Sequence, residues 1–280
     1  MSSEFGSLFL DFIKNTLGFI FPILLGSNAF FYLLFRCSKN ITYIDFGWAV
    51  NHFIVGIFYY CFNESYNYIE GGIFFVFLFI WSFRLAYHLS KRICREFSDP
   101  RYEMVFAEYS INRNVLYFIQ FEIQAFLGAL TSCSLYFVFR NNKVSSDFGD
   151  FFQNWNYVLG ILLVIIGIIG EGISDYQLET FKNTFYGSVG DKTAKKVCEE
   201  GFWRYSRHPN LFFEFCIWLG FGLAGIREAG DMLGLISPIS LFVVVNFLSV
   251  PITEKHMSKS RPYWHDYVER TNKYWPFFKI

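Results

Sequence analysis

The chain has 280 residues, of which 53% are hydrophobic and 22% are aromatic, a composition too apolar for an ordinary soluble domain. Its 24 basic and 24 acidic residues cancel, so no basic surface or tail favours a nucleic-acid partner. The six cysteines show no paired spacing, which supports neither a disulfide framework nor a zinc site.

Apolar runs dominate the chain and predict an all-α, polytopic integral membrane protein with about seven transmembrane helices. Most runs reach or approach the roughly 20 residues that a spanning helix needs, and the last two are short. No repeat or linker divides the chain, which predicts a single membrane domain over residues 1–280 with a cofactor-binding half at about 160–280. The runs are Leu17–Phe35, Ile44–Phe62, Gly72–Leu89, Leu116–Phe139, Tyr157–Ile173, Leu211–Ile226 and Leu235–Val250.

The loops between these runs differ in charge, and this difference predicts the orientation of the chain. The segments after the first, third, fifth and seventh runs are rich in lysine and arginine, whereas the alternate loops carry few. By the positive-inside rule, the N-terminus faces outward and the C-terminus faces the cytosol. The first run follows neither a basic region nor a cleavage site, so we expect a retained span rather than a signal peptide.

Polar residues recur at helical spacing in three of the runs, where buried charge is expensive. All three polar faces are predicted on the same side of the membrane. We therefore expect them to meet in one water-accessible cavity that opens to the cytosol. The three faces are Trp81, Arg84, His88, Arg92 and Arg95; Glu171, Asp175, Leu178 and Lys182; and Asn210, Glu214 and Trp218.

Some polar residues also have purely structural explanations. Arg92 and Arg95 can extend from a helix end to the interface, and Glu171 with Asp175 can be a solvated acidic pair. His52, in the second run, is expected to be a hydrogen-bonded core histidine.

The most informative segment is the loop Gly201–Asn210. It places Arg204, Arg207 and His208 before Pro209, and proline suits the start of a helix because it has no N–H to lose there. A helix start offers unbonded N–H groups and a positive dipole end, so with two arginines it is typical of an anion site, above all for phosphate. The alternative is a basic loop that touches lipid headgroups.

The C-terminal segment from Glu254 to Pro276 is basic, aromatic and amphipathic, and includes Tyr267 and Arg270. Alone, it is typical of an interfacial helix on anionic lipid. Beside an anion-binding helix start, it could equally fold back and close over a nucleotide. The sequence leaves both interpretations open.

Together these segments resemble the membrane reductases of the steroid 5-alpha-reductase superfamily over nearly the full length of the chain. The resemblance is closest to the branch described by a domain of unknown function. Its most specific part is Trp-Arg-Tyr-Ser-Arg-His-Pro-Asn at 203–210, with Glu214. The other matching segments are Asp45-Phe46-Gly47-Trp48, Trp81–Leu85 with His88 and Arg92, Asp99–Tyr102, Glu171–Lys182 and Glu254–Pro276.

The resemblance implies a seven-helix fold that takes up NADPH from the cytosol and reduces a conjugated carbon–carbon double bond in a lipophilic, steroid-like or other lipid substrate. It also favours the endoplasmic reticulum membrane. Asn210 and Glu214 would hold the nicotinamide carboxamide, and the basic loop and tail would hold the phosphates and the adenine ribose. The expected cofactor-binding residues are Arg84, Arg92, Arg101, Asp175, Lys182, Arg204, Arg207, His208, Asn210, Glu214, Trp218, Glu254, Tyr267 and Arg270, and no metal site is expected.

Such a reduction needs a hydrogen-bond donor or acid at the substrate carbonyl, where enolate charge develops. Tyr87 is the candidate by position, because a tyrosine hydroxyl stays protonated at neutral pH, and His88 is the rival. The chain has no counterpart of the Gln-Glu pair with which the steroid enzymes grip the steroid carbonyl; Tyr43 and Asp45 are the nearest polar groups. Glu179 stands where those enzymes tend to have a basic residue. The missing pair argues against a steroid substrate, whereas Glu179 would change how the cofactor phosphate is held.

Two other functions fit parts of the sequence. Membrane methyltransferases that use S-adenosylmethionine on isoprenylcysteine or phospholipids share the Arg-His-Pro helix start, a downstream glutamate and an aromatic tail. They usually have a small or aromatic residue after the proline, so Asn210 with Glu214 favours the reductase. The third alternative is a non-enzymatic lipid-binding membrane protein with a decayed site, and the retained Arg84 and Asp175 argue against decay.

Overall fold

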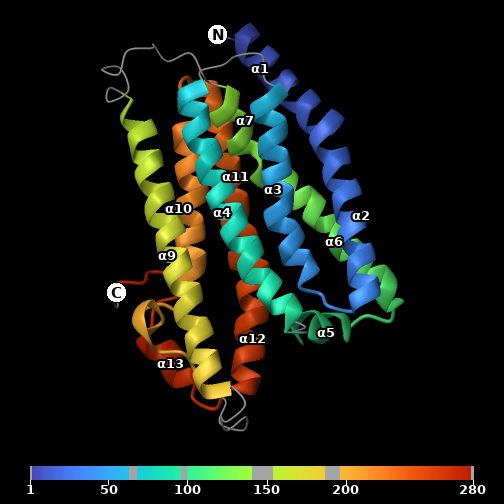
Figure 1. Cartoon of the computed structure of the whole chain (residues 1–280), viewed down its shortest axis with the longest axis vertical. Coiled ribbons are helices and arrows are strands. Elements are labelled where there is room, and N and C mark those ends of the chain that lie inside the picture. The colour runs from blue at the N-terminus through green and yellow to red at the C-terminus, as the bar shows by residue number, and fades with distance from the viewer. Residues whose placement is uncertain (1, 63–67, 96–99, 141–153, 187–195, 279–280) are drawn as a thin grey trace. The chain divides into compact units, whose positions relative to one another are not determined.

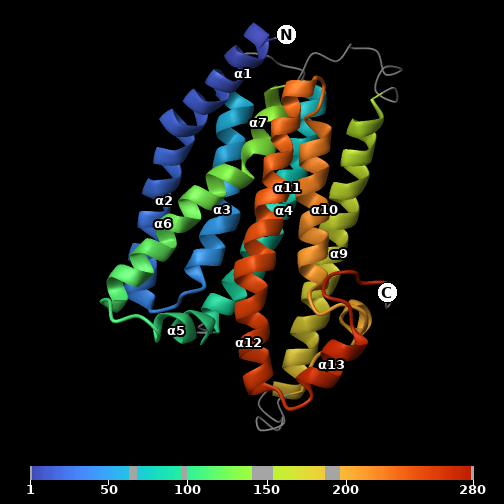
Figure 2. The same cartoon turned by 180° about the vertical axis from the view of Figure 1, so that it is seen from behind.

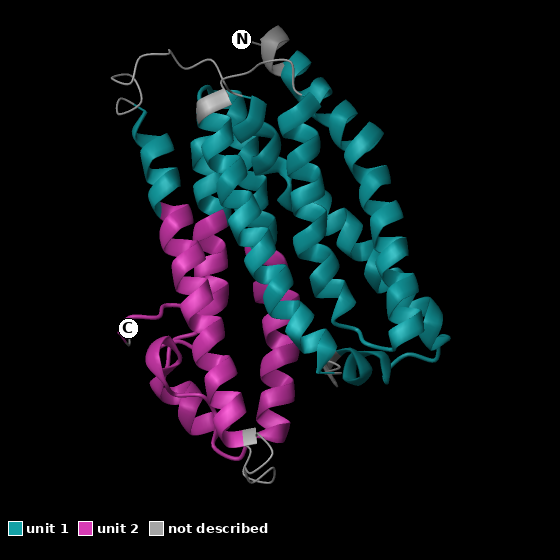
Figure 3. Ribbon diagram, in the orientation of Figure 1, with its two compact units in different colours: residues 1–162, 218–241 teal, residues 163–217, 242–280 magenta. Residues whose placement is uncertain are grey.

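The computed structural model describes residues 2–62, 68–95, 100–140, 154–186 and 196–278. These residues form helices and no strand, which confirms the all-α class. They divide into two compact units: unit 1 has residues 1–162 and 218–241, and unit 2 has residues 163–217 and 242–280 (Figure 3). The expected single domain stays a prediction, and unit 2 falls within its cofactor-binding half.

In unit 1, successive helices run in alternating directions: α2, α3, α4 and α6 (Figure 1). Helix α3 packs against α2 and α4, and α2 also packs against α6, as the view from behind shows (Figure 2). Its elements are α1 (Ser2–Asn15), η1 (Thr16–Ile20), α2 (Phe21–Ser38), α3 (Tyr43–Phe62), α4 (Tyr68–Cys94), α5 (Pro100–Phe106), α6 (Arg113–Thr131), α7 (Cys133–Arg140) and η3 (Ala229–Leu235).

Three helices contribute residues to both units, and the remaining elements belong to unit 2. The boundary falls within α9 (Trp155–Tyr186), α10 (Pro209–Ala224) and α11 (Ile236–Val244). The elements that lie wholly in unit 2 are η2 (Gly201–Arg204), η4 (Val245–Ser249), α12 (Val250–Ser260) and α13 (Trp264–Arg270).

Five helical stretches among the described residues are long and apolar enough to cross a membrane, and they indicate an integral membrane protein. The other two predicted runs form α3, which carries Asp45, Asn51 and His52, and α10, which is shorter. The count of seven spans therefore stays a prediction. The five stretches are Gly6–Ser38, Glu70–Cys94, Arg113–Arg140, Trp155–Phe185 and Ala229–Ser260.

Two π-helical turns precede prolines inside these stretches. One is η1, followed by Pro22, and the other is η4, followed by Pro251. Proline has no N–H for the carbonyl four residues earlier, and its ring collides with that carbonyl. A wider turn absorbs both defects without ending the helix. The last predicted run therefore continues through Pro251 into α12, which carries Glu254.

The core of unit 1 is aromatic around His52. The imidazole Nδ1 lies 2.8 Å from the Trp48 carbonyl oxygen, and Nε2 lies 2.7 Å from Thr131 Oγ1. The Trp218 ring centre is 4.8 Å from that of His52 and 5.2 Å from that of Trp81. His52 is therefore the hydrogen-bonded core histidine that the sequence predicts.

Glycines on α9 allow α10 to approach closely. In unit 2, a Cβ atom at Gly167 would lie 2.8 Å from the Phe213 carbonyl oxygen, and Gly170 faces the Phe213 ring. In unit 1, a Cβ atom at Gly160 would lie 2.7 Å from the Gly220 carbonyl oxygen. Small residues at such positions are how membrane helices pack backbone against backbone.

Candidate functional site

In unit 2, the loop before α10 is bound by the C-terminal segment. The backbone N–H of Arg207 donates to the Asn272 carbonyl across 2.9 Å, and that of His208 donates to the Lys273 carbonyl across 3.2 Å. Ser206 and Asn272 form an isolated parallel bridge. The C-terminal segment therefore folds back onto the loop, and its closing over a nucleotide stays a prediction.

Glu254 on α12 binds the side chains of both Arg207 and His208. Arg207 Nε is 2.9 Å and His208 Nε2 is 3.0 Å from the same oxygen, Glu254 Oε1. Because a carboxylate only accepts, neutral His208 carries its proton on Nε2. Arg207 also donates from a terminal nitrogen to the Thr271 carbonyl across 2.9 Å. We call Arg207, His208 and Glu254 the Arg–His–Glu cluster.

The surroundings of His208 lower the pKa of its imidazole. Burial is the main cause; the Glu254 carboxylate opposes the shift, and the charges of Arg207 and Lys273 add to it. His208 is therefore neutral at neutral pH. The cluster then holds one cation and one anion, so its charge is balanced.

These contacts bear on the expected phosphate site. The charge of Arg207 is offset by Glu254, and the N–H groups of Arg207 and His208 already bind protein oxygens. A charge-balanced pair attracts a phosphate less than an unpaired arginine does. Arg204, by contrast, is exposed, and its guanidinium lies 5.9 Å from the Tyr205 ring centre. Cofactor binding by these residues stays a prediction.

Tyr267 of α13 also binds the loop before α10, within unit 2. Its buried hydroxyl is 2.6 Å from the Trp203 carbonyl oxygen and 3.1 Å from that of Ser206. Burial raises the pKa of Tyr267 far above its ordinary value, so the hydroxyl remains a donor. Trp203 in turn donates from its indole to the Ser174 carbonyl on α9 across 2.9 Å.

Arg270, another expected cofactor residue, forms an exposed ion pair. Its guanidinium is 2.8 Å from Glu199, and the two side chains are 55% and 43% exposed. Ion pairs of this exposure contribute little to stability.

The expected nicotinamide ligands lie one turn apart on α10. Glu214 is buried at 8% exposure, whereas Asn210 is partly exposed. On α9, Asp175 is partly exposed and Lys182 is exposed. One turn beyond Glu214, Trp218 is fully buried in the aromatic core of unit 1.

The expected residues of α4 belong to unit 1. Arg84, His88 and Arg92 are partly buried, whereas Tyr87 is 58% exposed and its ring centre is 4.5 Å from Lys91 Nζ. Arg101 lies in α5, and its side chain is outside the described residues. The meeting of the three polar faces in one cavity stays a prediction.

A polar group around Asn246 in unit 2 was not predicted from the sequence. Asn246 lies in the π-turn η4, and its Oδ1 accepts from Lys273 Nζ across 2.6 Å and from the Tyr274 hydroxyl across 3.1 Å. Burial raises the pKa of Tyr274 to about 12, so this hydroxyl also stays protonated. The available signal was an asparagine in an apolar run shortly before Pro251.

The chain, with its Arg-His-Pro segment and its helical membrane fold, belongs to the steroid 5-alpha-reductase-like superfamily. Within it, the chain belongs to the family described as "protein of unknown function (DUF1295)", whose profile matches residues 31–272. The superfamily predicted from the sequence is thus confirmed, and the match identifies no specific enzyme. Neither the comparison with curated proteins nor that with solved structures found a match.

Proposed function

We propose that this protein is an NADPH-dependent membrane oxidoreductase that reduces a conjugated carbon–carbon double bond of a lipophilic substrate. The observation that carries the proposal is the buried Glu214 carboxylate, one turn beyond Asn210 and close to the helix start at Pro209. Burying a carboxylate in an apolar helix is costly, so a functional role explains it better than packing does. Membership of the reductase-like superfamily supports the same proposal.

Asn210 and Glu214 suit a nicotinamide carboxamide, because an amide donates to its oxygen and a carboxylate accepts from its NH₂ group. When bound, NADPH would supply a hydride. Arg204 and Lys182, both exposed, are the proposed phosphate ligands in unit 2. Arg207 and His208 would position the loop through Glu254, in addition to any contact with the cofactor.

Protonation of the substrate would be the task of α4. Tyr87 and His88 are the proposed donors at the substrate carbonyl, where a hydrogen bond stabilises the developing enolate. We also propose the endoplasmic reticulum membrane as the location, with the C-terminus in the cytosol.

Methyl transfer from S-adenosylmethionine is the second candidate, because those enzymes share the Arg-His-Pro start, the glutamate and the aromatic tail. In this protein the shared features bind one another through the Arg–His–Glu cluster and the backbone of the C-terminal segment. They therefore have a structural role that either function would need, and they do not discriminate. Asn210 with Glu214 is the pair that favours NADPH.

The test is the thermal stability of the purified full-length protein in detergent with NADPH, NADH or S-adenosylmethionine. A ligand at about 100 times its dissociation constant stabilises the folded state by about 2.7 kcal/mol. Stabilisation by NADPH alone supports the reductase. Stabilisation by S-adenosylmethionine alone replaces it with methyl transfer, and no response to any ligand favours a non-enzymatic lipid-binding protein.

A further inference from the structure

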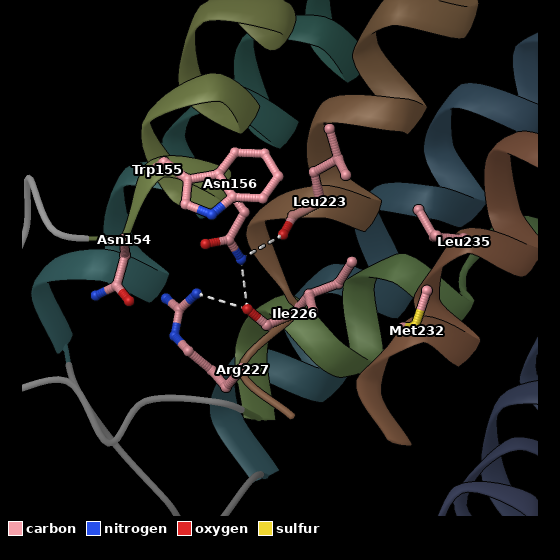
Figure 4. Close-up of a pocket in the computed structure, with 8 residues that line it drawn as sticks. All are labelled: Asn154, Trp155, Asn156, Leu223, Ile226, Arg227, Met232 and Leu235. Atoms are coloured by element: carbon pink, nitrogen blue, oxygen red, sulfur yellow. Dashed lines mark hydrogen bonds between the residues drawn. The ribbon is translucent and has the colours of Figure 1, made fainter. Parts of the chain in front are cut away.

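A pocket of about 400 Å³ lies in unit 1 at the C-terminal end of α10 (Figure 4). This volume is within the range of about 300–1,000 Å³ that is usual for small-molecule sites. Its walls come from the start of α9, the end of α10 and η3. No residue assigned to NADPH or to proton donation lines it.

The pocket lies beside the ends of candidate membrane spans, where a membrane–water boundary is expected. Three candidate spans begin beside it, at Glu70, Trp155 and Ala229. Arg227 lines the pocket and donates to Glu70 Oε2 across 3.0 Å, so two of these span starts meet there. Trp155 lines its mouth at 69% exposure, the placement typical of interfacial tryptophans.

Asn156 and Arg227 form the polar end of the pocket. Asn156 Nδ2 donates to the Leu223 carbonyl across 3.1 Å, and Arg227 donates to the Ala224 carbonyl across 3.0 Å. Both side chains therefore satisfy carbonyls at the end of α10. These bonds use the amide nitrogen of Asn156 and leave its Oδ1 as an acceptor, on the side away from the dashed bonds in Figure 4.

The charges around this polar end select the ligand class. The Arg227 guanidinium is paired with Glu70, and the Arg227 backbone N–H donates to Asp231 across 2.9 Å. An anionic head group would meet a cation that is already neutralised. A cationic head group could not reach the carboxylates, because Glu70 and Asp231 are both buried and bonded. An uncharged hydroxyl meets neither obstacle, and it can donate to Asn156 Oδ1.

Apart from Asn154, the remaining walls are apolar. The pocket is lined by Trp155, Leu223 and Met232, which present an indole, a branched alkyl chain and a thioether. Such surfaces bind a hydrocarbon chain or ring by excluding water from it. A polar end and apolar walls at a membrane boundary match an amphipathic molecule.

We propose that this pocket binds an uncharged amphipathic lipid. Its hydroxyl head would donate to Asn156 Oδ1 beside Arg227, and its apolar part would lie against Trp155, Leu223 and Met232. The site is additional to the proposed cofactor site and does not depend on the reductase function.

The experiment uses the full-length protein in phospholipid nanodiscs and a monoacylglycerol that carries a diazirine on its acyl chain. After illumination, we expect labelled peptides from the start of α9 or from η3, and we expect excess unlabelled monoacylglycerol to remove that label. A phosphatidic acid with the same photoreactive chain should label these peptides several-fold less. Absence of label from these peptides, or equal labelling by the anionic probe, would overturn the proposal.

A matched pair of variants tests the location. Met232→Trp fills the mouth of the pocket, and Met232 is 55% exposed, so the change avoids the core. Ile239→Trp places the same ring on α11 at a residue that is 60% exposed. Met232→Trp should lose most of the label and Ile239→Trp should keep it, with wild-type thermal stability in both. Equal labelling of the two variants would contradict the assignment. The competition by unlabelled monoacylglycerol is measured on the wild type, so it does not depend on the folding of either variant.

Discussion

Arg207 and Glu254 are 47 positions apart in the chain, yet Arg207 Nε donates to Glu254 Oε1 across 2.9 Å. His208 binds the same oxygen, so α12 and the loop before α10 are joined at one carboxylate. A segment that predicts an anion site is thus also a structural element of unit 2. A ligand that binds the start of α10 would therefore lie next to a loop that this carboxylate holds in place.

Removing the carboxylate of Glu254 should loosen the loop and the C-terminal segment. Glu254→Ala leaves Arg207 and His208 without their shared acceptor. The side chains of Arg207 and Glu254 are only 11% and 23% exposed, so we expect a cost of about 1–3 kcal/mol, below that of a fully buried pair. Thermal unfolding measures the loss, and hydrogen exchange should rise at the amides of Arg207 and His208.

The matched control for Glu254→Ala is Lys259→Ala, at an exposed position of the same helix. It should leave both the unfolding midpoint and the exchange unchanged. If the two variants behave alike, the Arg–His–Glu cluster does not hold the loop.

The lowered pKa of His208 makes unit 2 sensitive to acid. The unfolded chain binds a proton at His208 at a higher pH than the folded chain, so folding stability falls as the pH drops through the ordinary histidine range. The protection factors of the Arg207 and His208 amides, which correct for the pH dependence of intrinsic exchange, should therefore fall as the pH drops from about 7.5 to about 5.5. His208→Gln keeps a donor for Glu254 but does not titrate, so it should flatten this profile. An unchanged profile in the variant would assign the effect to other groups.

Tyr267→Phe should destabilise unit 2 although it removes one atom. The hydroxyl serves two backbone carbonyls, those of Trp203 and Ser206, in a buried site. Leaving buried acceptors unsatisfied costs about 1–3 kcal/mol. Tyr263→Phe, at a residue that is 66% exposed, is the matched control and should be neutral in thermal unfolding. Equal midpoints for the two variants would rule out the hydroxyl as a structural donor.

Gly167→Ala should destabilise the packing of α9 on α10 in unit 2. The new methyl group would lie 2.8 Å from the Phe213 carbonyl oxygen, so the helices must separate. Overpacking of this kind costs about 1–3 kcal/mol. Gly26→Ala on α2 meets nothing within 4 Å and should be neutral or stabilising. A wild-type unfolding midpoint for Gly167→Ala would show that the helices do not depend on this close approach.

The helices were largely predictable, because apolar runs of this length have few alternatives to a helix. The extension of the last run through Pro251 was not predicted, since proline usually ends a helix and the π-turn that accommodates it has no simple sequence signature. The short helix α5 and the exact bounds of α13 were also beyond the hydropathy pattern.

The candidate site was predictable residue by residue, but its contacts were not. Arg207, His208 and Glu254 each stood out by local pattern. Their shared bond was invisible because local spacing says nothing about residues that far apart. Asn246 was missed for a related reason: its partners, Lys273 and Tyr274, lie in a different segment of the chain.

We propose that α10 holds NADPH through Asn210 and Glu214, and the affinity of the purified protein for NADPH, measured by fluorescence titration, tests this. The wild type should bind, and Glu214→Ala should weaken binding by about 10- to 100-fold, the worth of a hydrogen bond to a charged group. Glu200→Ala, at an exposed position of unit 2, should bind as the wild type does. Unaltered affinity in a folded Glu214→Ala variant would show that Glu214 does not hold the nicotinamide.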